Sequence, residues 1–305
     1  MAKFKRKYTL GEEIFNSVSH GIGAGLSIAG TVVLIVTAAI HTNAWGVVSS
    51  CIYGASLIIL YTMSTLYHSF TNEKVKAFFR IMDHNTIFLL IAGTYTPITL
   101  YYLNGATGWI LFGIVWASAI FGIVMNSINL EKARIPSIFC YIGMGWVIIF
   151  AIKPLMEHMP SISGIFLIIG GIFYTVGIIF YAIKKVKYFH SIWHLFTVAG
   201  SVFHYFAILL GFYNNFLNIG CIGNGYCSVR VYVCNPKFYK KICLVYRNTC
   251  GNLSYRQSFL WKCVLLLVSL VICVVLNIIG IFEFVEILVC VVAVAIDFNN
   301  TDCNV

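Results

Sequence analysis

The amino-acid sequence predicts an all-α, polytopic membrane protein built around a bundle of seven transmembrane helices. Three observations predict this class. Hydrophobic residues make up 60% of the chain and charged residues only 10%, and the mean hydropathy is +0.90, which is far from the balance of soluble domains. Apolar segments of spanning length recur as far as Tyr213, and basic residues are confined there to the short segments that flank and connect them.

The seven predicted spans lie before Tyr213, and each is almost free of charged side chains. A spanning helix needs about 20 predominantly apolar residues. The segments that meet this requirement are 18–40, 46–70, 82–103, 107–127, 136–153, 162–183 and 190–212. The sequence therefore predicts a seven-helix membrane domain over residues 1–213, followed by a second region over residues 214–305.

The basic residues of the membrane domain predict how it is oriented. Cytoplasmic connections of membrane proteins carry an excess of Lys and Arg. The N-terminus and the second, fourth and sixth connections together hold twelve basic residues, whereas the other three connections hold only Lys153. The twelve are Lys3, Lys5, Arg6, Lys7, Lys74, Lys76, Arg80, Lys132, Arg134, Lys184, Lys185 and Lys187. We therefore expect the N-terminus to be cytoplasmic.

The same charges argue against two other classes of protein. A net charge of +10 would fit a nucleic-acid-binding protein, but such proteins gather basic residues into one patch or stripe. Here the charges are interrupted by apolar spans, so we expect no nucleic-acid partner. We also expect no secretory signal, since the N-terminal lysines are followed by the polar Gly11-Glu12-Glu13 rather than by a short apolar region and a cleavage site.

Several ionisable side chains are predicted to gather at the cytoplasmic end of the bundle. His190 and His194 are four residues apart, so on an α-helix they project from one face, one turn apart. With seven alternating spans, the end of the second span near His68 and the start of the third near Asp83 lie at the same membrane depth. An ionisable residue inside a span indicates a functional site.

These residues predict a zinc centre. Catalytic zinc is commonly held by three protein ligands with water in the fourth position, and binding lowers the pKa of that water to about 7. His68, His190 and His194 are the candidate ligands. Asp83 is the candidate general base that orients the water, and Ser64, one turn before His68, is the candidate for hydrogen-bonding the water or polarising a substrate carbonyl.

Simpler interpretations of these residues remain open at this point. Polar residues at helix ends often extend to the membrane surface, which accounts well for the lysines and arginines but less well for histidines set inside the apolar limits. Three further histidines are weaker candidates for metal binding: His20, His84 and His204. His204 is expected to pack between helices. No glutamate lies between His190 and His194, so the pattern differs from the HEXXH site of metalloproteases.

Four motifs occur in order along the membrane domain. They are Gly11 to Gly21, Ser64 to His68, Asp83-His84 followed by Ile91 to Pro97, and His190 to His194. Together they resemble the haemolysin III family, the bacterial branch of the progestin and adiponectin receptor superfamily, over about residues 8 to 212. The resemblance implies a seven-helix protein in a bacterial plasma membrane. It also implies zinc near the cytoplasmic side, held by His68, His190 and His194, with Asp83 and Ser64 in supporting positions.

The resemblance is compatible with three functions. The superfamily is similar to alkaline ceramidases, which implies a zinc-dependent hydrolase acting on amide or ester bonds of membrane lipids, the expected partners. The family name implies a cytolysin that forms pores. A receptor or membrane-homeostasis sensor would instead use the zinc structurally, to hold spans two, three and seven together.

Residues 214–305 differ in character from the membrane domain and match no part of the family pattern. Nine of the eleven cysteines lie there, and disulfides are chemically possible if the segment is extracytoplasmic. The apolar stretch from Leu260 to Ile296 has the length of one span or a tight hairpin, although Glu283 and Glu286 near its middle disfavour a simple buried helix. We therefore expect a Cys-rich extension with one or two further apolar segments.

Overall fold

The described part of this computed structural model, residues 8–183 and 185–214, consists of helices joined by short connections, with no strand among them. The elements are α1 (Leu10–His41), α2 (Ala44–Ser69), α3 (Glu73–Pro97), the π-helix η1 (Ile98–Leu103), α4 (Gly105–Ile128), α5 (Leu130–Trp146), the 3₁₀-helix η2 (Val147–Ala151), α6 (Ile152–His158), α7 (Ser161–Ala182) and α8 (Phe189–Asn214). The expectations for the Cys-rich extension fall on residues 215–305, outside the described residues.

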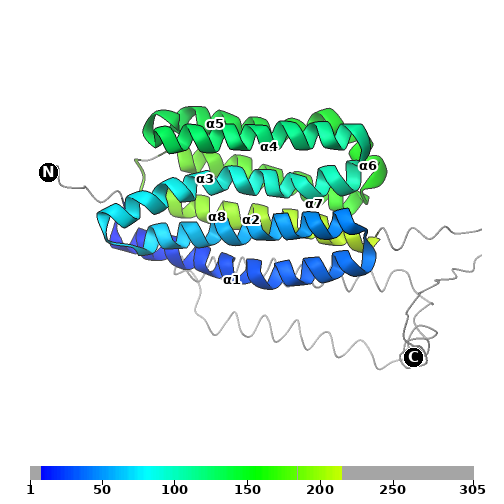
Figure 1. Ribbon diagram of the computed structural model, residues 1–305. Coiled ribbons are helices and arrows are strands. Elements are labelled where there is room, and N and C mark those ends of the chain that lie inside the picture. The colour runs from blue at the N-terminus through cyan, green and yellow to red at the C-terminus, as the bar shows by residue number, and fades with distance from the viewer. Residues whose placement is uncertain (1–7, 184, 215–305) are drawn as a thin grey trace, which may run out of the picture. The chain divides into compact units, whose positions relative to one another are not determined.

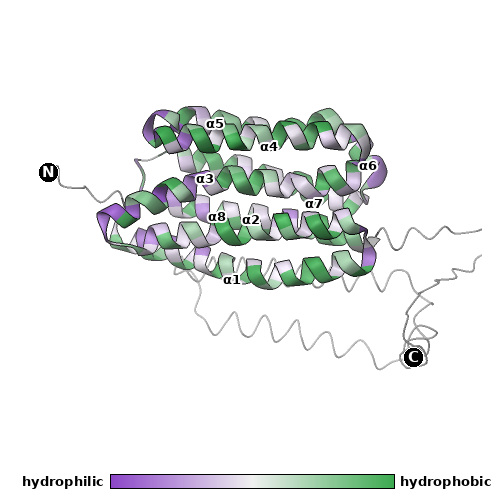
Figure 2. Ribbon diagram, viewed as in Figure 1, coloured by the Kyte–Doolittle hydropathy of each residue, from purple (hydrophilic) through white to green (hydrophobic). Residues whose placement is uncertain are grey.

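Within the described residues, seven spans are long and apolar enough to cross a membrane, which confirms the predicted fold class. The fifth runs through α5, η2 and α6, from Leu130 to His158. Hydrophobic residues cover most of the helix lengths in Figure 2, and hydrophilic residues gather toward the ends. Large apolar side chains are exposed on the outside of the bundle, for example Phe150 at 89% and Phe139 at 70%. Lipid tails would cover such a surface, which a soluble protein rarely exposes.

Three spans begin earlier than the apolar segments of the sequence predict. The helices start at Leu10, Glu73 and Leu130, where the apolar segments start at residues 18, 82 and 136. Each start is fixed by a capping side chain, since Thr9, Asn72 and Asn129 accept hydrogen bonds from the first free backbone N–H groups. Lys76 and Arg80 therefore lie on the first turns of α3 rather than in a loop.

The helices form a closed ring. Helices that are adjacent in the chain pack against each other, α5 packs against α7, and α8 returns to pack against α1 (Figure 1). Of the seven spans, the one containing α3 and η1 is the most enclosed, with 72% of its apolar window buried, and it contacts α2, α4 and α5. Polar residues in the apolar part of this span, such as Asp83 and Thr86, are therefore surrounded mainly by protein rather than lipid.

The described basic residues mark one end of the bundle. α1, α3, α5 and α8 begin at this end, and α2, α4 and α7 finish there, so we call it the basic end. The lysines and arginines at this end are Lys74, Lys76, Arg80, Lys132, Arg134, Lys185 and Lys187. Lys153, on α6, lies at the opposite end. The side chains that the sequence singles out as metal ligands all lie at the basic end.

Candidate metal centre

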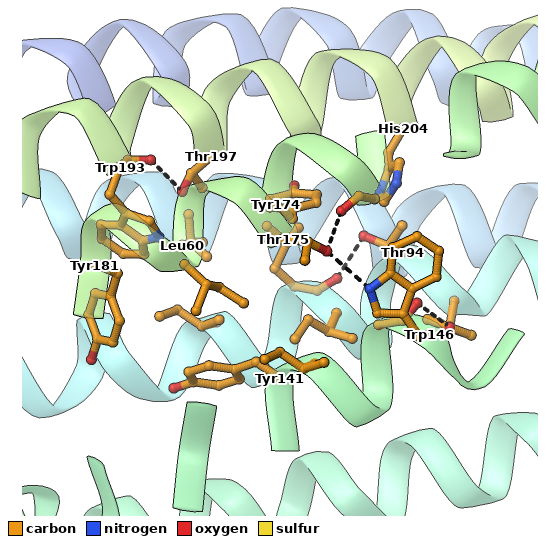
Figure 3. A pocket seen from close by; sticks show the side chains of 18 of the residues that line it. Leu60, Thr94, Tyr141, Trp146, Tyr174, Thr175, Tyr181, Trp193, Thr197 and His204 are labelled. Carbon is orange, nitrogen blue, oxygen red and sulfur yellow. Dashed lines mark hydrogen bonds between the residues drawn. The ribbon is translucent and has the colours of Figure 1, made fainter. Parts of the chain in front are cut away.

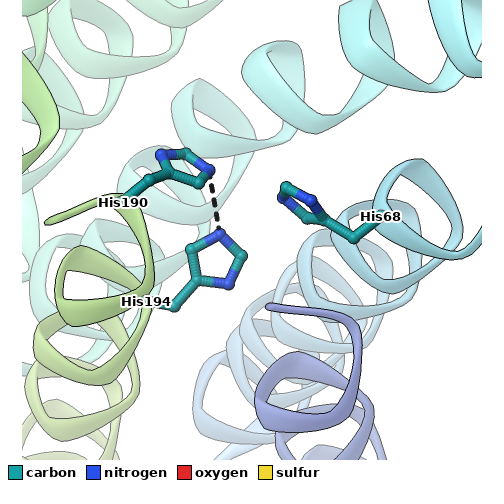
Figure 4. Close-up of side chains that lie close together, drawn as sticks. All are labelled: His68, His190 and His194. Atoms are coloured by element: carbon teal, nitrogen blue, oxygen red, sulfur yellow. Dashed lines mark hydrogen bonds between the residues drawn. The ribbon is translucent and has the colours of Figure 1, made fainter. Parts of the chain in front are cut away.

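The three predicted ligands come from two helices that meet at the basic end. His68 lies in the last turn of α2, and His190 and His194 lie in the first two turns of α8. Figure 4 shows the two α8 rings facing the His68 ring across the gap between the helices. His68 is 3% exposed and His194 is fully buried. Because i and i+4 share a helix face, both α8 rings point toward α2.

The separations within this histidine cluster suit a metal ion. Each of the three side chains offers one nitrogen, and these nitrogens lie within 4.8 Å of one another. The Nε2 atoms of His190 and His194 are 3.2 Å apart. Zinc–nitrogen bonds of 2.0–2.1 Å in a tetrahedron place two ligand nitrogens about 3.3 Å apart. The Nε2 atoms of His190 and His194 already have this spacing. The nitrogen of His68 would need to move only slightly closer to them for all three to bind one zinc ion.

His68 presents one nitrogen to the cluster and uses the other for a hydrogen bond. Its Nδ1 lies 2.6 Å from Oε2 of Glu13. A carboxylate oxygen only accepts, so Nδ1–H is the donor. The other nitrogen, Nε2, is buried and has no hydrogen-bond partner among the described residues. A histidine that donates Nδ1–H to a carboxylate keeps its Nε2 lone pair for a metal, so the residues present fit a zinc ion.

Glu13 contacts the histidine cluster, although the sequence analysis gave the supporting carboxylate to Asp83. Glu13 lies in the first turns of α1, and its second oxygen, Oε1, is 3.0 Å from the Nζ of Lys76 on α3. Lys76 also donates to the carbonyls of Tyr67 (3.0 Å) and Phe70 (3.3 Å) at the end of α2. The sequence feature that could have identified Glu13 is its position as an acidic residue at the same membrane depth as His68.

The segment at the start of α1 also contacts α8. The ring of Tyr8 stacks on His190, with ring centroids 4.7 Å apart and an interplanar angle of 18°. Burial raises the pKa of the Tyr8 phenol well above its ordinary value, and the neighbouring Tyr67 and Tyr181 add to this, so the phenol stays neutral. Glu12 accepts a hydrogen bond of 2.8 Å from the backbone N–H of Tyr188, just before α8. The start of α1 therefore packs directly beside the histidine cluster.

His20, a weaker candidate from the sequence, lies against the cluster. Its ring stacks on His194 with centroids 3.7 Å apart, and it meets the edge of Tyr61 at 5.0 Å. The side chain is 1% exposed, and neither ring nitrogen has a hydrogen-bond partner among the described residues. Face-to-face stacking keeps the nitrogens of His20 away from a metal ion shared with His194, so His20 supports that ligand by packing.

The remaining predicted site residues are buried at the same end. Asp83 on α3 is 2% exposed, and its Oδ2 lies 3.5 Å from Nδ1 of His84. Ser64 is fully buried one turn before His68, and its hydroxyl has no hydrogen-bond partner among the described residues. His84 and His204 do not belong to the histidine cluster. His204 contacts the carbonyl of Leu167 at 3.0 Å, which is a contact between α8 and α7.

A cavity of about 110 Å³ lies inside the bundle beside the cluster (Figure 3). Its wall is mostly aromatic and aliphatic, and it includes Leu60, Ile91, Tyr141, Trp146, Tyr174 and Trp193. Asp83 and His20 line the same cavity. The cavity borders the histidine cluster through His20, which stacks on His194, and through Trp193, whose ring centroid is 5.0 Å from that of His190.

Comparison with known proteins matches residues 8–205 to the family described as "Haemolysin-III related". The chain is 46% identical to Hemolysin-3 of Bacillus cereus over 198 residues, which are 65% of this chain and 90% of that protein. It is 45% identical to the Hemolysin-3 homolog of Bacillus subtilis over 202 residues, 66% of this chain and 95% of that protein. The human monocyte to macrophage differentiation factor is 26% identical over 218 residues, 68% of this chain and 87% of that protein. With its seven apolar spans and this match, the chain is an integral membrane protein that belongs to the haemolysin III family, the bacterial branch of the progestin and adiponectin receptor superfamily.

Proposed function

We propose that this protein is a zinc-dependent hydrolase that cleaves amide or ester bonds of lipids within the membrane. The observation that carries the proposal is the convergence of His68, His190 and His194 beside an apolar cavity whose wall includes a carboxylate. Three nitrogen ligands leave a fourth position of zinc open, which is the arrangement of catalytic rather than structural zinc sites.

The catalytic role proposed for each side chain follows from its position in the structure. A bound zinc ion supplies a Lewis acid that polarises a carbonyl and activates water at neutral pH. Asp83, on the cavity wall, offers a carboxylate oxygen to accept a proton from the attacking water. Ser64, buried one turn before His68 with an uncommitted hydroxyl, offers a hydrogen bond to the carbonyl oxygen of the lipid.

The composition of the cavity wall supports a lipid as the substrate. Aliphatic and aromatic side chains from α2, α3, α5, α7 and α8 line it, so an acyl chain would be held by apolar contacts alone. Asp83 and His20 are polar groups of this wall, and His20 stacks on His194 of the histidine cluster. A lipid whose apolar chain enters the cavity would therefore have its polar linkage near the metal.

We also propose that the basic end faces the cytoplasm and that the membrane is the plasma membrane of a bacterium. The excess of lysines and arginines at the basic end supports this orientation, because positively charged connections are retained on the cytoplasmic side during insertion. The bacterial Hemolysin-3 relatives support the type of cell. In this orientation the metal lies near the inner leaflet.

The test is metal analysis and lipid turnover on the purified full chain, wild type against His68→Ala. The wild type should hold about one zinc per protein and release fatty acid from ceramide or from an ester lipid in mixed micelles. His68→Ala should lose both the zinc and the turnover. The matched control is His158→Ala, since His158 is exposed at the opposite end and bonds only within its own turn, to Pro154. The control should behave as wild type.

Two outcomes would overturn the proposal in favour of another function. Zinc that is bound stoichiometrically but supports no release from any amide or ester lipid would indicate a structural metal, as in a receptor or sensor. The relatives are named for haemolysis, so lysis of erythrocytes is measured in parallel. Lysis that persists in His68→Ala, with no lipid turnover in the wild type, would indicate a cytolysin that does not need the metal.

A further inference from the structure

We infer that Glu13, held by Lys76, is the positioning residue that sets the orientation and the protonated nitrogen of His68 for metal binding. This inference rests on the metal site of the proposed function. Lys76, Glu13 and His68 are joined in series, with 3.0 Å between Lys76 Nζ and Glu13 Oε1 and 2.6 Å between Glu13 Oε2 and His68 Nδ1. We call this series the Glu13 bridge.

The first step concerns which nitrogen of His68 carries the proton. A neutral imidazole has one N–H, and a metal needs the nitrogen without it. The carboxylate of Glu13 accepts from Nδ1, so the proton stays on Nδ1 and the lone pair is on Nε2. The same hydrogen bond fixes the rotation of the ring. Without Glu13, either nitrogen could carry the proton and the ring could turn.

The second step concerns the charge of Glu13. The side chain of Glu13 is 13% exposed and that of His68 is 0% exposed, and a carboxylate so enclosed is costly unless it is paired. Lys76, itself 12% exposed, supplies the pairing charge. Lys76 is anchored by the carbonyls of Tyr67 and Phe70, at the end of the helix that carries His68. The Glu13 bridge therefore fastens α1 and α3 to the one ligand contributed by α2.

The third step concerns the alternative carboxylate, Asp83. Nδ1 of His68 lies 2.6 Å from Oε2 of Glu13, whereas Oδ2 of Asp83 lies 3.5 Å from Nδ1 of His84, which is outside the histidine cluster. The two acids thus have separate positions. Glu13 lies behind a metal ligand, and Asp83 lies on the cavity wall where a substrate would bind.

The experiment measures metal affinity rather than activity. Cobalt(II) is titrated into the metal-free full chain in detergent while its visible absorption is followed, and zinc is then measured by competition with a chelator. Loss of a group that orients a metal-binding histidine weakens binding about 10- to 100-fold. We expect Glu13→Gln, which keeps an acceptor oxygen but not the charge, to weaken cobalt binding about 10-fold. Glu13→Ala should weaken it about 100-fold. Lys76→Met should fall between wild type and Glu13→Ala.

The matched control is Glu131→Gln, the same substitution in a glutamate at the basic end. Glu131 is exposed and pairs with Arg80, so its loss should leave the affinity for cobalt unchanged. A second readout separates positioning from folding. For each protein the increase in melting temperature on adding zinc is measured from its own metal-free value, and this increase should be smaller for Glu13→Gln than for wild type, because weaker binding stabilises less.

Each outcome has a distinct meaning. Unchanged cobalt affinity in both Glu13 variants, with normal binding by the wild type, would overturn the inference and leave the proposed function standing. A lower metal-free melting temperature with the same increase on adding zinc as in wild type would show a structural role only and also overturn it. Weaker binding in the variants, without any lipid turnover by wild type, would support the Glu13 bridge and reject the hydrolase. A wild-type chain that binds neither metal would reject both.

Discussion

His20 and Asp83 are buried polar residues on the wall of the cavity. The ring of His20 is stacked on that of His194, and Asp83 is enclosed on α3. Neither side chain belongs to the group of three histidines that could hold the metal. These two positions are therefore the ones at which a substitution should separate metal binding from turnover.

Replacing Asp83 with asparagine should leave the metal content unchanged and reduce lipid turnover by about 10²- to 10⁴-fold. Asparagine keeps the shape of the side chain but cannot accept the proton, and positioned general bases contribute rate factors of that size. Metal analysis measures the metal content, and the initial rate of fatty-acid release measures the lipid turnover. Thr94→Val is the control on the same helix and cavity wall, since the Thr94 hydroxyl bonds only Leu90 of its own helix. Equal rates in the two variants would exclude Asp83 as the base.

At the residue scale the sequence predicts which three histidines come together but not the residues that contact them. The spacing of His190 and His194 is enough to place them on one face, and the topology brings His68 to the same depth. Glu13 could not be assigned, because its contact with His68 depends on α1 beginning at Leu10, ahead of the apolar segment. The stacking of His20 on His194 depends on how closely α1 packs against α8, which helical periodicity does not encode.

At the scale of the elements, the ends of the helices carry the polar chemistry. Hydropathy finds the apolar middle of each span but not the capped, charged turns that precede it, and α1, α3 and α5 all begin with such turns. Thr9 and Glu12 form a reciprocal capping box at the start of α1, which satisfies two free backbone donors. These turns extend the spans beyond the apolar segments, and they carry Glu13 and Lys76.

The packing of α4 on α3 makes a prediction about one glycine. A Cβ at Gly122 would overlap the ring of Phe88 on α3, whereas a Cβ at Gly113, on the same helix, would meet open space. Gly122→Val should therefore lower the free energy of unfolding by about 1–3 kcal/mol, as overpacking of a filled interior does, and Gly113→Val should not. Thermal unfolding of the two purified variants in the same detergent measures the difference. Equal stability would show that α4 can move away from α3 at little cost.

At the scale of the whole molecule, the seven-span architecture follows from apolar length, and the family match covers residues 8–205. The ring order of the helices follows from short connections between neighbours in the chain. The contact that closes the ring, α8 against α1, could not be derived from local pattern because the two helices are the most distant spans in sequence. The cavity likewise depends on side chains from five elements.

The proposed orientation predicts which end of the bundle is accessible from outside the cell. Glu73 at the basic end and Glu157 at the opposite end are both exposed, so a cysteine at either position would react readily with a maleimide. In intact cells, a membrane-impermeant maleimide should add label to Glu157→Cys beyond the level of the unmodified chain. Glu73→Cys should gain label only after the cells are permeabilised. The reverse pattern would place the metal centre on the outer side.

The contact between the first and last spans has a consequence for biogenesis. A ribosome delivers His68 with the second span, but the other two imidazoles and the surface against which α1 closes come only with the seventh. Nascent chains that have inserted six spans cannot yet capture zinc with the full ligand set. Metal uptake would thus follow insertion of the seventh span, and a zinc-loaded molecule would be one in which the second and seventh spans have come together.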